Sequence, residues 1–117
     1  MSESILDSVK HAIGGMTSEY TVFDDDVIMH INSSFAALWE IGVGPKTGFA
    51  ITDASAEWSD YLPEGPVRAM VKEYVTKKAQ LYFDPPQSGT LVDVINRQLD
   101  ELTFRLNVAV DPATTFD

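Results

Sequence analysis

Apolar residues recur three or four positions apart in four stretches of this chain, the spacing that gathers them on one face of an α-helix. In the first stretch, residues 2–13, they are Ile5, Leu6, Val9, Ala12 and Ile13, and Gly14-Gly15 interrupts the pattern. We therefore predict a short amphipathic helix near the N-terminus, followed by a connector of extended character over residues 16–23.

The second stretch predicts the clearest helix. Asp24-Asp25-Asp26 opens it, Gly42 and Gly44 end it, and its apolar stripe consists of Val27, Ile28, Ile31, Phe35, Leu38 and Trp39. Three successive carboxylates can indicate a cation site. They also suit a helix start, because an Asp side chain accepts hydrogen bonds from the free N–H groups of the first turn and opposes the positive end of the helix dipole. We favour this capping interpretation.

The third and fourth stretches predict two long helices that form a hairpin. One begins near Pro63 or Glu64 and ends at Phe83, before Pro85-Pro86. The other begins near Ser88 or Thr90, where Thr90-Leu91-Val92-Asp93 resembles a capping box. Their stripes are Val67, Met70, Val71, Tyr74, Lys78, Leu81 and Tyr82 in one helix, and Leu91, Ile95, Leu99, Leu102 and Leu106 in the other. Because only residues 84–87 separate them, the two helices should pack as antiparallel neighbours.

Two segments lack helical periodicity. Residues 43–63 are punctuated by Gly and Pro and indicate a long loop, in which Phe49-Ala50-Ile51-Thr52 has the composition of a short strand and residues 56–62 that of a single helical turn. After Asn107 the pattern stops. The predicted fold is all-α: a small bundle of three longer helices plus a short N-terminal helix, with one domain over residues 1–107 and a flexible, extended C-terminal tail over residues 108–117.

Composition narrows the class of protein. A length of 117 residues suits one domain, and 44% hydrophobic with 22% charged residues suits a folded chain. No apolar run approaches the roughly 20 residues of a membrane-spanning helix, and the N-terminus does not read as a signal peptide. The absence of cysteine excludes disulfides and thiolate metal sites. A net charge of −10 opposes ordinary nucleic-acid binding, which depends on Lys and Arg.

Candidate chemistry is sparse. His11 and His30 are the two histidines, and neither is followed by a carboxylate or histidine three or four residues on, as a helical metal site requires. There is no glycine-rich phosphate loop and no nucleophile elbow. We predict no catalytic, cofactor-binding or metal-ligating residue, no cofactor, and no enzyme activity. The large aromatic residues belong either to a core or to a protein interface; they are Trp39, Trp58, Tyr61, Tyr74, Tyr82 and six phenylalanines.

Several segments in series carry a resemblance. They are Phe23 to Asn32, Ile41-Gly42-Val43-Gly44-Pro45, Gly48 to Asp53, Trp58-Ser59-Asp60-Tyr61-Leu62, Val71-Lys72-Glu73-Tyr74-Val75, Lys78 to Pro86 and Gln98 to Asn107. In this order they resemble the head-tail connector, or head-completion adaptor, family of tailed phages and prophages of Gram-positive bacteria. The resemblance spans about residues 1–107.

This resemblance implies a structural virion subunit that is assembled in the bacterial host cytoplasm. Copies would form a homo-oligomeric ring, commonly of twelve, below the portal protein. Before assembly, the chain is compatible with a monomer in solution. The ring would extend the DNA channel, let DNA pass without specific binding, and join the head to a stopper or tail-completion protein. No membrane is involved.

Two hypotheses refine this picture. Part of the negative surface should face the ring lumen, so that DNA slides past. Residues 43–63 and 108–117 should contact neighbouring proteins, and deletion of residues 108–117 should leave a folded monomer that cannot attach to the portal.

Composition allows two other classes of protein. One is an acidic DNA-mimic inhibitor of a DNA-binding protein, although eight Lys and Arg residues dilute such mimicry. The other is a small enzyme that holds a divalent cation with Asp24 to Asp26 and His30, for which calorimetric metal titration is the test.

Overall fold

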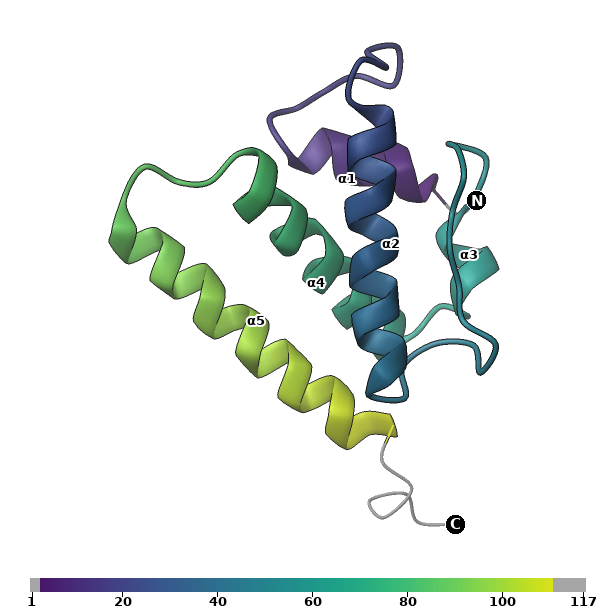
Figure 1. The fold of residues 1–117 in the computed structure, drawn as a ribbon. Coiled ribbons are helices and arrows are strands. Elements are labelled where there is room, and N and C mark those ends of the chain that lie inside the picture. The colour runs from purple at the N-terminus through teal and green to yellow at the C-terminus, as the bar shows by residue number, and fades with distance from the viewer. Residues whose placement is uncertain (1–2, 111–117) are drawn as a thin grey trace.

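The helices predicted from apolar spacing are present in the computed structural model, which describes residues 3–110 (Figure 1). They are α1 (Ile5–Ala12), α2 (Asp24–Glu40), α4 (Pro66–Phe83) and α5 (Gly89–Val110), and the helical turn predicted within residues 56–62 is the short helix α3 (Trp58–Tyr61). Residues 3–110 contain no β-sheet; an isolated antiparallel bridge joins Ser4 to Glu57. The all-α prediction is therefore confirmed.

Helix α4 is the centre of the bundle. It packs against α1, α2 and α5, and α5 runs antiparallel beside it as the second arm of a hairpin (Figure 1). Its buried face is formed by Val71, Tyr74, Val75 and Ala79. This arrangement confirms the predicted hairpin, which follows from the short connection between the two helices.

A single hydrophobic core joins the helices to the long loop. Its members come from α1, α2, α3, α4, α5 and the segments between them, and include Ile5, Val9, Val27, Ile31, Phe35, Leu38, Val43, Ile51, Trp58, Tyr61, Val71, Leu99 and Leu106. The loop is thus fastened to the bundle by its own apolar side chains. Among residues 3–110, no helix is long and apolar enough to cross a membrane.

The segment predicted as a short strand, Phe49 to Thr52, does not form one. The side-chain amide of Asn32 takes the place of a neighbouring strand: its Nδ2 donates to the Ile51 carbonyl at 2.9 Å, and the Ile51 N–H donates to its Oδ1 at 2.8 Å. Both backbone groups are therefore satisfied without strand pairing while the Ile51 side chain is buried. The strand prediction was wrong because a side chain on α2 supplies this partner.

The two long helices begin at or close to the predicted residues. Helix α4 begins at Pro66, after Gly65, where proline suits the first helical position because its missing N–H needs no partner. Helix α5 begins at Gly89, and Ser88, not Thr90, accepts the hydrogen bond of the first turn, from the Leu91 N–H at 3.4 Å. The connector over residues 16–23 contains turns and no strand.

Helix α5 also continues to Val110, three residues beyond Asn107. The part of the predicted tail at residues 108–110 is therefore helical, and Val110 packs against the core. The rest of that prediction, residues 111–117, lies outside the described residues.

Candidate interaction surfaces

The three carboxylates at the start of α2 do not cap the helix as predicted. The N-cap residue is Phe23, and no side chain makes a capping hydrogen bond there. The carboxylates occupy the first turn, where their charge still opposes the helix dipole. Asp24 also forms an ion pair, in which its Oδ1 lies 2.8 Å from Nζ of Lys10.

Lys10 was missed as a structural residue. It lies on α1 with 1% of its side chain exposed, and its Nζ also donates to the Ser18 carbonyl at 3.4 Å. The ion pair thereby holds the start of α2 against α1, and the hydrogen bond holds the connector there. The sequence signal was a lysine beside the apolar positions Leu6, Val9 and Ile13, which long polar side chains rarely occupy without a partner.

His30 lies at the boundary of the core, where it contacts the C-terminal end of α4. Its ring stacks on Tyr82 with centroids 4.9 Å apart, and Phe83 meets it edge-on at 5.7 Å. Burial lowers the pKa of His30, the charge of Lys78 lowers it further, and a backbone hydrogen bond with Lys78 offsets part of this. The imidazole is thus held neutral more firmly than a free one.

This contact leaves an open hollow between α2 and α4. It has a volume of about 380 Å³ and is lined by Asp26, Met29, His30, Ser33, Tyr82 and Phe83. A second hollow of about 520 Å³ shares Tyr82 and Phe83 and extends along Tyr20, Phe23 and Asp84. We call the two together the aromatic hollow. Tyr82 is 70% exposed and Met29 68% exposed, so large apolar groups face solvent here.

The hypothetical cation site of Asp24 to Asp26 and His30 gains no support from this geometry. Among residues 3–110, no group of three or more His, Asp or Glu side chains is placed to hold a metal ion. Asp24 instead pairs with Lys10, and His30 packs among aromatic rings.

The aromatic residues divide between the two roles that sequence left open. Phe35, Trp58 and Tyr61 form the centre of a ring cluster; the centroids of Phe35 and Tyr61 lie 4.6 Å apart. Burial raises the pKa of Tyr61 to about 12. Trp39 is 49% exposed and Tyr82 is 70% exposed, so both rings remain largely outside the core. Trp58, Tyr61 and Tyr74 therefore belong to the core, whereas Trp39, Tyr82 and Phe104 do not.

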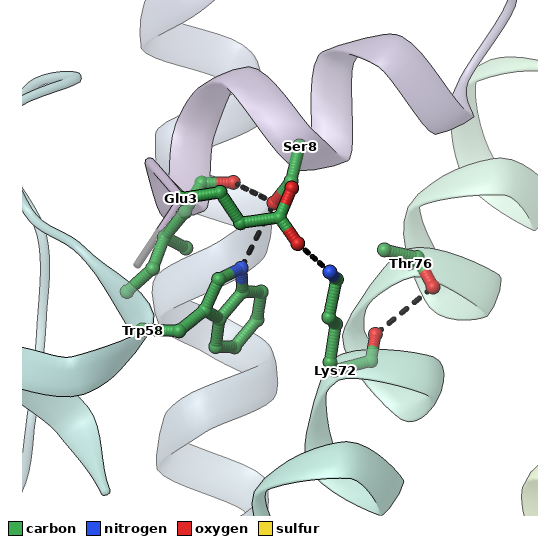
Figure 2. Close-up of polar contacts among 6 residues, drawn as sticks. Glu3, Ser8, Trp58, Lys72 and Thr76 are labelled. Atoms are coloured by element: carbon green, nitrogen blue, oxygen red, sulfur yellow. Dashed lines mark hydrogen bonds and ion pairs between the residues drawn. The ribbon is translucent and has the colours of Figure 1, made fainter. Parts of the chain in front are cut away.

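The chain start, α3 and α4 are tied together by the contacts in Figure 2. Nε1 of Trp58 donates to Oγ of Ser8 at 3.0 Å, and the Glu3 carboxylate pairs with Lys72 on α4. The backbone agrees, since the Trp58 N–H donates to the Glu3 carbonyl at 3.2 Å. A capping box of Glu57 and Asp60 stabilises the short helix α3. These two carboxylates therefore have a structural role.

The outward side of α5 is a second exposed surface. Phe104 is 69% exposed, and Arg97 and Arg105 are exposed along the same helix. The carboxylates of Asp100 and Glu101 are exposed on this helix as well. Nothing among residues 3–110 covers this face.

Comparison with known proteins gives one assignment. The model of a family described as "Phage connector protein" matches residues 5–113. No curated protein and no solved structure matches significantly. The matched region contains all five helices, including the hairpin whose sequence carries the resemblance. From this match over nearly its whole length, the chain belongs to the phage connector protein family.

Proposed function

We propose that this chain is a subunit of an oligomeric ring at the head-tail interface of a phage, below the portal protein. The ring extends the DNA channel and joins the head to a stopper or tail-completion protein. The family match over residues 5–113 carries the proposal, since a phage connector is a structural component that contacts other head and tail proteins. It favours this role over the acidic DNA mimic that composition also allowed.

The surface supports an assembling role. Large apolar side chains are exposed on three separate elements, with Met29 on α2, Tyr82 on α4 and Phe104 on α5. Large aromatic residues are enriched where proteins bind one another, because they contribute much contact area. A chain of this size that leaves such groups in solvent is well suited to being covered by neighbours.

The charge of the chain supports passage of DNA. With a net charge of −10, a ring lumen that carries part of the acidic surface repels the phosphate backbone. We therefore retain the hypothesis of an acidic lumen. A ring reconstruction with a neutral or basic lumen would contradict it.

The two segments expected to contact neighbours are narrowed by the fold. In residues 43–63, the side chains of Val43, Ile51, Trp58 and Tyr61 belong to the core, so the exposed residues of the loop remain for partners, those at 46–47 and 52–55 among them. At the C-terminus, residues 108–110 belong to α5, so a deletion that tests the tail begins at residue 111. The shortened chain should fold normally and fail to attach to the portal; normal attachment removes the tail from the proposal.

Deletion of the gene from the phage or prophage that encodes it tests the proposed function. Without the protein, DNA-filled heads and finished tails should accumulate separately, as seen by negative-stain microscopy of lysates. The wild-type chain supplied from a plasmid should restore complete virions. Complete, infectious virions formed in its absence would contradict the proposal.

A further inference from the structure

An open apolar hollow lies at the end of the bundle where α5 finishes. It has a volume of about 380 Å³, and its apolar lining comes from Leu62, Pro63, Pro66, Val67 and Val110. We call it the terminal hollow. Leu62, Val67 and Val110 are partly buried and pack against the core, so the hollow is an uncovered continuation of that core.

Helix α5 ends at the rim of the terminal hollow. The last described residue, Val110, is one of the residues that line it. A Cβ added at Gly42 would lie 3.5 Å from Cγ2 of Val110, so the end of α5 meets the turn that follows α2 (Figure 1). Residues 111–117 therefore begin beside an apolar surface that residues 3–110 leave open.

Phe116 is the one large apolar residue of this segment. Pro112 disfavours continuation of the helix, because it lacks a backbone N–H and restricts the residue before it. At 3.3–3.6 Å per residue, the six residues from 111 to 116 span at most roughly 20 Å, and a chain reversal takes about four of them. A dry cavity of about 150 Å³ accepts benzene, so the terminal hollow has room for the phenyl ring.

The charges at the rim do not select the occupant. Glu64 is exposed there, and Arg68, which donates from Nη1 to the Leu62 carbonyl at 3.1 Å, forms no ion pair among residues 3–110. Asp111 and Asp117 flank the segment that would dock. One rim charge attracts these carboxylates and the other repels them. The apolar lining and the position of the chain end therefore decide which group fills the hollow.

The source of the ring is the same molecule. A short connection holds two groups of one chain at an effective concentration on the order of millimolar. A second copy of the chain, or another phage protein, competes only at its own free concentration. Contact within one molecule therefore prevails before assembly.

We infer that Phe116 of the free subunit packs into the terminal hollow of its own chain, against Leu62, Val67 and Val110. Docking extends the core over a surface that is otherwise open to solvent, and it holds residues 111–117 on the subunit until a partner binds them. The role of this docking in assembly rests on the proposed function, in which the same segment attaches to the portal. The docking itself does not require the ring.

Nuclear magnetic resonance of the isolated chain tests the contact directly. The ring protons of Phe116 should show nuclear Overhauser effects to the methyl groups of Leu62 and Val67, and Phe116→Ala should shift the amide signal of Gly42. Thr115→Ala is the matched control and should leave that signal close to its wild-type position. A Phe116 ring without contacts to these methyl groups overturns the inference.

Disulfide trapping separates a docked segment from one that is only attached nearby, and the cysteine-free sequence makes it clean. Glu64→Cys with Asp117→Cys places one thiol at the rim of the hollow and the other beside Phe116. Asn107→Cys with Asp117→Cys is the control, because Asn107 is exposed on α5 about one turn before Val110 and does not line the hollow.

With oxidised glutathione as the oxidant, the first pair should close an intramolecular disulfide about tenfold faster than the control pair. Adding Phe116→Ala to the first pair should reduce its rate to that of the control. Equal rates in the two pairs overturn the inference, and so do disulfides that join two chains in place of the intramolecular product.

Both tests use the isolated chain, so their failure leaves the connector role standing. If the wild-type chain fails to restore head-tail joining, the proposed function fails and the docking of Phe116 is unaffected.

Discussion

Helices α1 and α5 are both amphipathic, but the chain uses them differently. Helix α1 has eight residues and buries four of them, a lysine included, because α2, α4 and the connector surround it. Helix α5 has 22 residues and fully buries three, all leucines, against α4 as its main neighbour. The comparison indicates that stability resides in the body formed by α1 to α4, whereas α5 is an arm whose outward face is exposed.

The largest expected effect separates two aromatic residues of these regions. Trp58→Ala should lower the free energy of unfolding by about 3–5 kcal/mol, because it removes a fully buried ring and its hydrogen bond to Ser8. Phe104→Ala should change it by less than about 0.5 kcal/mol, since that ring is mostly in solvent. Urea denaturation followed by circular dichroism measures both. Equal losses would remove the distinction between body and arm.

The next effect concerns the buried ion pair. Lys10→Ala should destabilise the chain by about 2–3 kcal/mol, somewhat below the effect of breaking a fully buried pair, because Asp24 keeps partial contact with solvent. Lys77→Ala is the matched control, with an expected loss under about 1 kcal/mol for its more exposed pair with Glu73. Equal losses of stability in the two variants would show that Lys10 stabilises the chain no more than a surface lysine does.

A smaller effect is expected at Gly44, which lies where the loop passes the ring of Tyr61. Its φ is +102°, and an added Cβ would approach the Tyr61 ring to 3.0 Å. Gly44→Ala should therefore lower the melting temperature by several degrees, corresponding to about 1–2 kcal/mol or more. Gly48 has a φ of +87° and open space around it, so Gly48→Ala isolates the backbone strain. A Gly44 variant no worse than the Gly48 variant argues against close packing on Tyr61.

The smallest effect is a pH dependence at His30. Its folded pKa lies below the ordinary 6.5, first through burial, so below pH 6.5 the unfolded chain binds the proton more readily. The contribution of His30 to stability is complete above that pH and is lost as pH falls towards the lowered pKa. His30→Gln should flatten the decline in stability between about pH 7 and pH 5.5. An unchanged slope would assign the decline to other groups.

The helices could be predicted from sequence because their evidence is local. The apolar stripe of α2 and the prolines between α4 and α5 act through neighbours in the chain, and the hairpin follows from them. The contacts that were missed are made across the fold. Asn32 takes the place of a strand partner for Ile51, and Lys10 forms an ion pair with Asp24. Neither pair could be predicted from the spacing of residues along the chain.

From the sequence, the large aromatic residues could be assigned only to one of two places, the core or a protein interface. The sequence contains twelve large aromatic residues, yet composition does not say which of them remain outside the core. The fold shows which role each ring takes. Helix α3 directs the Trp58 ring into the core, whereas α4 packs on the leucine side of α5 and leaves Phe104 exposed on the opposite side.

The central claim is that this chain is a structural part of the head-tail interface. Cryo-electron microscopy of virions of the encoding phage tests it most directly. The account predicts a ring of copies below the portal, with the α4 and α5 hairpin recognisable in each subunit. A neck region built without this chain, in virions that are complete and infectious, would contradict it.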